Sequence, residues 1–203
     1  MFYLFSNVTK ITTYYLIGST DIFAAELRKR LESLDPNIPS FTYLSFQAVH
    51  SPLQAPAKYI DLYRNLKDPK RRNYNAMVTS MDTAIYSVVK SYKEFGFWND
   101  TVLVFSSDNG GSTKAGASNW PLRGDKGTLY EGGIRSVGFV HSPLLPVNRM
   151  GAITKNLMHV TDWFPTMMHL AGCKNKHYGG KPLDGTSQAE FSNTTVFISI
   201  FTS

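Results

Sequence analysis

The sequence predicts an α/β fold, with a mainly parallel sheet flanked by helices. Short runs of apolar and β-branched residues alternate along the chain with longer segments of helical periodicity, which is typical of α/β domains. Glycine and proline gather in the segments between them and mark turns and loops. Polar residues directly follow two of the predicted strands, at the end of a parallel sheet where ligands usually bind. A ligand-binding α/β domain is therefore the starting hypothesis.

Two helices are expected in the first half of the chain. Residues 21–34 carry apolar side chains at helical spacing, and Asp21 suits the N-cap position. Residues 69–95 carry a longer apolar stripe, with Pro69 in the first turn and Gly96 after the last. This stripe, expected to face the core, consists of Tyr74, Met77, Val78, Met81, Ile85, Val88, Val89 and Tyr92.

Three segments have the composition of strands. Residues 41–46 form a β-rich run bounded by prolines and are expected to be a buried strand; residues 101–105 are apolar, as in a sheet covered on both faces. Residues 136–140 form a third run after a glycine-rich loop. A last helix is expected from Thr161, as its cap, to Gly172.

The composition is that of a folded protein and excludes several classes. Hydrophobic residues make up 42% of the 203 residues and charged residues 18%, which is too apolar for a disordered chain. The net charge is +6, but no recognisable nucleic-acid module accompanies it, so no nucleic-acid partner is expected. No apolar run approaches the roughly 20 residues of a membrane span. The lone Cys173 excludes an internal disulfide and a multi-cysteine zinc site.

Asp108 and Asn109 are candidate metal ligands. They follow the apolar run 101–105, and Gly110 and Gly111 come next. A carboxylate and an amide oxygen suit calcium or magnesium better than zinc, and glycines let the backbone approach a ligand closely. The alternative is an ordinary Asp-Asn-Gly turn.

Lys126 and His50 are candidate substrate-binding residues. Residues 119–133 form a glycine-rich loop that contains Arg123 and Lys126, so backbone N–H groups and an ammonium could meet a sulfate or phosphate there. His50 follows the run 41–46 and could donate a proton to a leaving oxygen. A solvated loop and a surface histidine are the alternatives.

Five segments together resemble the sulfatase family, and most closely its arylsulfatase B-like branch, over about residues 20–187. The matching segments are Phe46-Gln-Ala-Val-His-Ser-Pro-Leu-Gln, Phe105-Ser-Ser-Asp-Asn-Gly-Gly, Asn119-Trp-Pro-Leu-Arg-Gly-Asp-Lys-Gly-Thr, Gly138-Phe-Val-His-Ser-Pro-Leu-Leu and His159-Val-Thr-Asp-Trp-Phe-Pro-Thr. The resemblance implies an alkaline-phosphatase-like fold and hydrolysis of sulfate esters, with sulfated glycans or aryl esters as the expected substrates. It also implies one Ca²⁺ held by Asp108 and Asn109, with Lys126 on the sulfate and His50 at the leaving oxygen.

The chain also departs from the family pattern. The Cys-x-Pro/Ala-Ser-Arg motif that becomes the formylglycine nucleophile, the paired aspartates and the Gly-Lys-Trp-His stretch are not found, and Cys173 has a different context. We therefore expect a divergent segment at 1–20, a partial catalytic domain at 21–187 and a divergent apolar tail at 188–203. The alternative is a catalytically inactive sulfatase-like protein that binds sulfate or glycans.

The resemblance implies a lysosomal or secreted protein. Asn-x-Ser/Thr sequons at Asn7, Asn99 and Asn193 fit that location, with Asn99 as the expected glycosylation site. The first residues do not form a convincing signal peptide. The expected partner is a sulfated small molecule or glycan.

Overall fold

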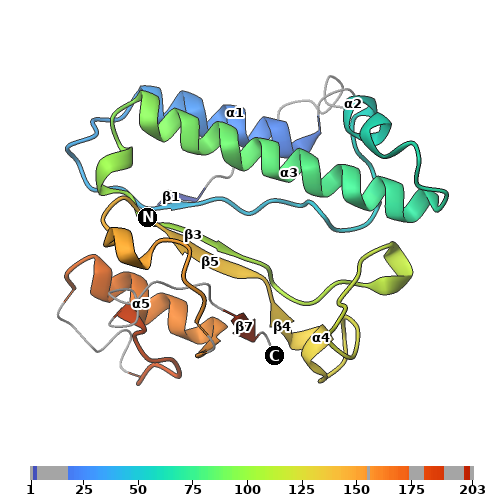
Figure 1. Ribbon diagram of the computed structural model, residues 1–203. Helices are drawn as coiled ribbons and strands as arrows, with labels where there is room; N and C mark the ends of the chain where they lie inside the picture. Colours follow the sequence, from blue (N-terminus) through green and yellow to red (C-terminus); the bar gives the residue numbers. More distant parts are fainter. Residues whose placement is uncertain (1, 4–17, 155, 174–180, 190–198, 202–203) are drawn as a thin grey trace. The chain divides into compact units, whose positions relative to one another are not determined.

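The computed structural model describes residues 2–3, 18–154, 156–173, 181–189 and 199–201. The chain divides into two compact units, one of residues 1–99 with 114–117 and the other of residues 100–113 with 118–203. Helices and strands alternate in both (Figure 1), so the α/β class is confirmed. Within the described residues, none of the helices has the length and apolar character that a bilayer crossing requires.

The first unit is built on two helices that lie side by side (Figure 1). The two are α1 (Ser19–Glu32) and α3 (Pro69–Glu94), with the short α2 (Ala57–Ile60) and the 3-10 turn Asp61–Tyr63 between them in sequence. Asp68 caps α3 by accepting a hydrogen bond from the Lys70 N–H at 2.9 Å, and Pro69 occupies the first turn as expected. The expected cap of α1 is wrong: Gly18 is the N-cap, and Asp21 lies in the first turn, where its charge still suits the helix dipole.

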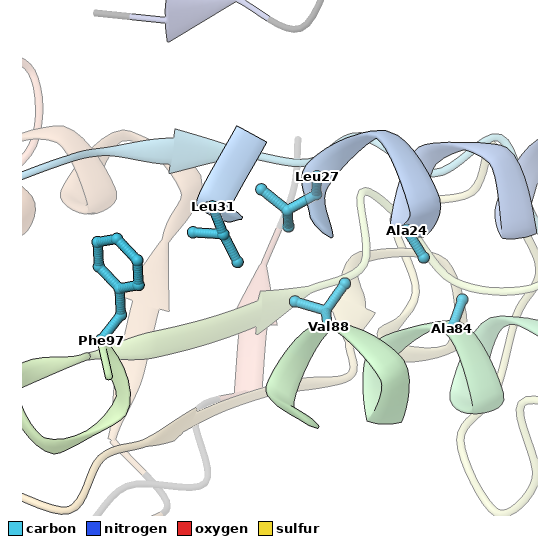
Figure 2. Packing of buried hydrophobic residues seen from close by; sticks show 6 residues of the cluster. All are labelled: Ala24, Leu27, Leu31, Ala84, Val88 and Phe97. Atoms are coloured by element: carbon cyan, nitrogen blue, oxygen red, sulfur yellow. The ribbon is translucent and has the colours of Figure 1, made fainter. Parts of the chain in front are cut away.

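The core of this unit lies between α1 and α3. Figure 2 shows Leu27 and Ala24 facing Val88 and Ala84, with Leu31 beside Phe97. The predicted stripe on α3 was partly wrong, because Val78 is 38% exposed while Ser80 and Ser91 are buried. Small side chains let the two helices approach closely, and the Ser91 hydroxyl is satisfied by the Ser87 carbonyl at 2.9 Å.

An ion pair joins the same two helices at the surface. The Arg28 guanidinium donates two hydrogen bonds to the Glu94 carboxylate, at 2.7 and 2.6 Å, and lies over the Phe95 ring at 4.9 Å. This pairing lowers the pKa of Glu94, because the hydrogen bonds from Arg28 favour the ionised carboxylate.

The expected buried strand at 41–46 is wrong in extent and burial. Only β2 (Thr42–Tyr43) is a strand, paired parallel with β1 (Phe2–Tyr3), and Phe41 and Tyr43 are 49% and 65% exposed. Phe46 packs against the α1–α3 core. A run of β-prone residues therefore alternates between core and solvent here.

The second unit contains most of the strands. They are β3 (Leu103–Ser106), β4 (Arg135–Ser136), β5 (Gly138–His141), β6 (Leu157–His159) and β7 (Ser199–Phe201). β3 pairs with β5, and β7 lies between β4 and β6. Its helices are α4 (Glu131–Ile134) and α5 (Trp163–Leu170), and 3-10 turns occupy Val147–Arg149 and Val160–Asp162. Two further 3-10 turns, Trp98–Asp100 and Thr113–Ala115, span points in the sequence where one unit ends and the other begins.

Strand direction differs from the expected parallel arrangement in part of the described sheets. β6–β7 is parallel, whereas β3–β5 and β4–β7 are antiparallel. In the β3–β5 ladder Ser106 pairs with Gly138, so the loop between them leaves and re-enters at one end of the pair. A parallel pair needs a crossover that returns the chain to the other end. The glycine-rich loop makes no such crossover.

Asp162 anchors the end of the second unit. It is 8% exposed, and its carboxylate accepts hydrogen bonds from the backbone N–H of His159 (3.0 Å) and Thr186 (2.8 Å). The expected cap Thr161 is wrong, because Asp162 is the N-cap of α5 and the His159 side chain caps the 3-10 turn before it.

Candidate functional site

Asp108 and Asn109 lie in a turn immediately after β3. The Ser107 N–H donates to the Val137 carbonyl at 2.9 Å, and the Ser107 hydroxyl donates to the Asn109 carbonyl at 3.0 Å. The Asn109 Nδ2 donates to the Gly110 carbonyl at 2.9 Å, which leaves its Oδ1 available as an acceptor. Asp108 is exposed, and no hydrogen bond to its carboxylate comes from the described residues. A carboxylate and an amide oxygen are thus adjacent and available.

Gly110 brings this turn against the backbone of the following loop. Its N–H donates to the Gly133 carbonyl at 2.9 Å, and a Cβ at this position would lie 1.8 Å from the Gly132 oxygen. Only glycine fits such an approach. The sequence suggested a close approach of this backbone to a ligand; the close approach that the structure shows is to the protein's own loop.

The loop with Lys126 is bonded to the same turn. Asn119 pairs with both polar groups of Gly111, and the Lys126 N–H donates to the Gly111 carbonyl at 3.2 Å. Asp125 holds the loop by accepting from the Thr113 N–H at 2.7 Å. The structure therefore brings Asp108, Asn109 and the backbone of Lys126 together in the second unit.

The two cations of this loop have different surroundings. The Arg123 guanidinium stacks over the Tyr130 ring at 4.1 Å and donates to its hydroxyl at 3.0 Å. The Lys126 side chain is exposed, and its ammonium has no partner among the residues that the structure describes. Lys126 is consequently the better placed of the two to meet an oxyanion.

His50 belongs to the first unit. Its ring is exposed, its Nδ1 lies 2.9 Å from the Ser51 carbonyl, and its N–H donates to the Gln47 carbonyl at 3.0 Å. Because a carbonyl only accepts, Nδ1 carries the hydrogen. Nε2 is then the ring atom left to exchange a proton with a ligand.

The donor set at Asp108 and Asn109 fits a hard divalent cation. Both side chains offer oxygen, and the Asp108 carboxylate is not used in any hydrogen bond between described residues. Nowhere in the described part of the chain do three or more His, Cys, Asp or Glu side chains cluster as a metal group would need. These two residues could therefore supply only part of a coordination shell.

Asn119 is the residue that the sequence reasoning passed over. In the sequence Asn119 is simply the first residue of the glycine-rich motif, yet its amide makes three hydrogen bonds, to Gly111 and Gly124. An asparagine at the start of a glycine-rich loop was the available signal. Its partner Gly111 lies eight residues earlier, and no spacing rule connects the two.

Comparisons with known proteins agree with this architecture. The family model described as Sulfatase matches residues 3–173. Arylsulfatase J of Mus musculus is 50% identical over 155 residues, which cover 76% of this chain and 26% of the relative. N-acetylgalactosamine-6-sulfatase of Rattus norvegicus is 29% identical over 140 residues, 67% of this chain and 25% of the relative. The chain thus spans about a quarter of the length of these curated relatives.

A solved structure shows the same fold. The crystal structure of Ps i-CgsB in complex with k-i-k-neocarrahexaose superposes with a TM-score of 0.73 at 31% identity, over 87% of this chain and 39% of that one. The expected alkaline-phosphatase-like fold, as part of a larger domain, is confirmed. The relatives named above are sulfuric ester hydrolases, and the chain belongs to the sulfatase family.

Proposed function

We propose that this chain carries the cation- and sulfate-binding part of a sulfuric ester hydrolase of the arylsulfatase type. Asp108 and Asn109 are proposed ligands of one Ca²⁺, and Lys126 and His50 are proposed contacts of the sulfate ester. The observation that carries the proposal is the bonding of the Asp108–Gly111 turn to the Lys126 loop through Gly111. This bonding supports the proposal because it joins the turn that carries the proposed cation ligands to the backbone of Lys126, whose ammonium would attract an oxyanion.

The chemistry of each residue follows from its surroundings. Bound Ca²⁺ would supply positive charge that stabilises the negative charge developing on the sulfate. The Lys126 ammonium, with no described partner, binds a sulfate oxygen as a point charge. His50, with Nδ1 held by the Ser51 carbonyl, offers Nε2 to the leaving oxygen and donates its proton there as the imidazolium.

Turnover needs a nucleophile in addition to these binding groups. In the family it is a formylglycine made from cysteine, and the only cysteine of the 203 residues is Cys173, which is exposed after α5. We therefore propose that the 203-residue chain binds the cation and sulfate but does not hydrolyse the ester, because binding residues do not replace an activated nucleophile. Hydrolysis of 4-nitrocatechol sulfate by the unaltered chain, abolished by Asp108→Ala, would contradict this proposal.

The proposed substrate is a sulfated glycan. One structural neighbour is a complex with a neocarrahexaose, and one relative is named for N-acetylgalactosamine 6-sulfate; both names support a glycan for this chain as well. A lysosomal or secreted location, with glycosylation at the exposed Asn99, is part of the same proposal.

A binding experiment tests the proposed site. Calcium titrations of the 203-residue chain should show one site that Asp108→Asn weakens at least tenfold, whereas the exposed Asp184→Asn in the same unit changes nothing. Sulfate binding should fall with Lys126→Met and persist with Lys181→Met, an equally exposed lysine. Calcium affinity equal in Asp108→Asn and Asp184→Asn would contradict the metal assignment.

The second candidate is a non-catalytic sulfatase-like protein that binds sulfate or glycans. The context of Cys173 favours it, since no nucleophile motif surrounds that residue. Glycan binding that survives a joint Lys126→Met and His50→Gln change would place the glycan elsewhere on the chain and count against the proposed Lys126 and His50 contacts.

A further inference from the structure

Asn119 holds one peptide of the Asp108–Gly111 turn by both of its polar groups. The Gly111 N–H donates to the Asn119 Oδ1 at 2.8 Å, and the Asn119 Nδ2 donates back to the Gly111 carbonyl at 2.8 Å. The pairing is like that of two residues facing each other in an antiparallel ladder, except that one partner is a side chain. It needs a donor and an acceptor on one planar group, which a carboxamide supplies.

The same amide reaches the loop that carries Lys126. Its Nδ2 also donates to the Gly124 carbonyl at 3.2 Å. The Gly111 carbonyl, in turn, accepts from the Lys126 N–H at 3.2 Å in addition to the Asn119 amide. Asn119 is half-buried, so these bonds are partly shielded from competing water. The turn with the proposed cation ligands and the backbone of Lys126 therefore form one bonded group with Asn119 at its centre.

We propose that Asn119 is a positioning residue that sets the spacing between the Asp108-Asn109 turn and Lys126, and thereby couples cation binding to sulfate binding. The coupling rests on the proposed function of the site. Asn119 needs no contact with either ligand. A cation that orders the turn also orders the Lys126 loop through Gly111, and sulfate acts in the opposite direction by the same factor, because coupling between two sites is reciprocal.

Asn119→Leu is the most direct variant. Leucine has nearly the shape of asparagine but lacks both the donor and the acceptor, so the Gly111 peptide loses its partner while the volume is kept. The matched control is Asn148→Leu, because Asn148 is an exposed asparagine of the same unit whose side chain makes no hydrogen bond to the described residues. Thr128→Val is a stability control, because it removes the Thr128–Asp125 bonds of the loop without touching the Asn119–Gly111 pairing.

The experiment titrates the 203-residue chain with CaCl2 by calorimetry, with and without sodium sulfate. In the unaltered chain sulfate should lower the calcium Kd by about fivefold or more, within the usual range of coupling between sites. In Asn119→Leu this factor should fall to about one, while Asn148→Leu and Thr128→Val retain it. Hydrogen exchange is measured in parallel, and the Lys126 amide should exchange at least tenfold faster in Asn119→Leu only.

Each outcome supports or contradicts either the positioning role of Asn119 or the proposed function. The proposal is overturned if Asn119→Leu changes neither the effect of sulfate on the calcium Kd nor the exchange rate of the Lys126 amide. It is also overturned if Asn119→Leu lowers the Tm but leaves the effect of sulfate intact, since that outcome shows a structural role alone. An unaltered chain that binds no calcium contradicts the proposed function. Faster Lys126 exchange in Asn119→Leu would then still support the positioning role, and unchanged exchange would overturn it. Asn119→Ser, which keeps one oxygen, gives the same readouts if Asn119→Leu does not fold.

Discussion

Replacing Gly110 by alanine tests the close contact that shapes the candidate site. The added Cβ would lie 1.8 Å from the Gly132 oxygen, 2.8 Å from the Gly132 carbonyl carbon and 3.0 Å from the Gly133 Cα. All three are backbone atoms, so no side chain can rotate away. Real Cβ contacts essentially never fall under 3.0 Å, so the two segments must separate by 1.2 Å or more, the difference from 1.8 Å.

That separation would break the hydrogen bond from the Gly110 N–H to the Gly133 carbonyl, which is 2.9 Å long. Leaving those groups unpaired where both glycines are buried costs about 1–3 kcal/mol. The strain of the inserted methyl adds about 1–3 kcal/mol. We therefore expect Gly110→Ala to lower the free energy of unfolding of the second unit by about 2–6 kcal/mol.

Urea unfolding measures this loss as a lower midpoint, by roughly 1–3 M for an ordinary slope. The control is Gly18→Ala, where the nearest atom to an added Cβ is 3.8 Å away on the Pro56 side chain; because Gly18 is the N-cap of α1, the expected loss there is that of a weaker cap alone, about 1 kcal/mol. Equal midpoints for the two variants, with the Gly110 amide still protected from exchange, would refute the reasoning.

Three further changes are expected to have measurable effects. Asp162→Ala removes the buried carboxylate that accepts from the N–H groups of His159 and Thr186 and should lower the unfolding free energy by about 2–5 kcal/mol, because each hydrogen bond to a charged group contributes about 1.5–3 kcal/mol; urea unfolding measures the loss, and Asp162→Asn should be less severe. Arg28 lowers the pKa of Glu94 in the folded chain. The ion pair therefore stabilises the fold at pH values above the ordinary glutamate pKa, and this contribution is lost as pH falls through the lowered pKa. Glu94→Gln should consequently make the Tm fall less steeply as the pH is lowered. Expression in a secretory system should add a glycan at the exposed Asn99, seen as a mass shift removed by Asn99→Gln.

The helices were predictable from the sequence because their signals are local. Asp68, Pro69 and Gly96 mark the ends of α3 by their own backbone preferences. Which face of α3 is buried was less predictable. Ser80 and Ser91 are buried because small side chains suit the close approach of α1, and a polarity pattern assigns serine to solvent.

The candidate site was likewise predictable from the sequence only in part. Asp108 was expected after a strand and Lys126 in a glycine-rich loop; the structure has both in those positions and bonds the two segments together, while their roles stay predictions. The role of Asn119 depends on Gly111, which only the folded chain brings opposite it. Whether β3 and β5 run parallel or antiparallel also depends on how the loop between them folds back, which periodicity does not encode.

The glycines of this region specify the site at least as strongly as its charged residues do. Asp108 and Lys126 are exposed, so their side chains do little to determine where the backbone goes. The position of that backbone is determined where Gly110 meets Gly132, since any Cβ at Gly110 would overlap the Gly132 oxygen and a Cβ at Gly132 would lie 2.5 Å from the Gly124 oxygen. A chain that kept Asp108 and Lys126 but carried a larger residue at either glycine should therefore lose the spacing between the proposed cation ligands and the Lys126 ammonium, although every group proposed to contact a ligand was still present.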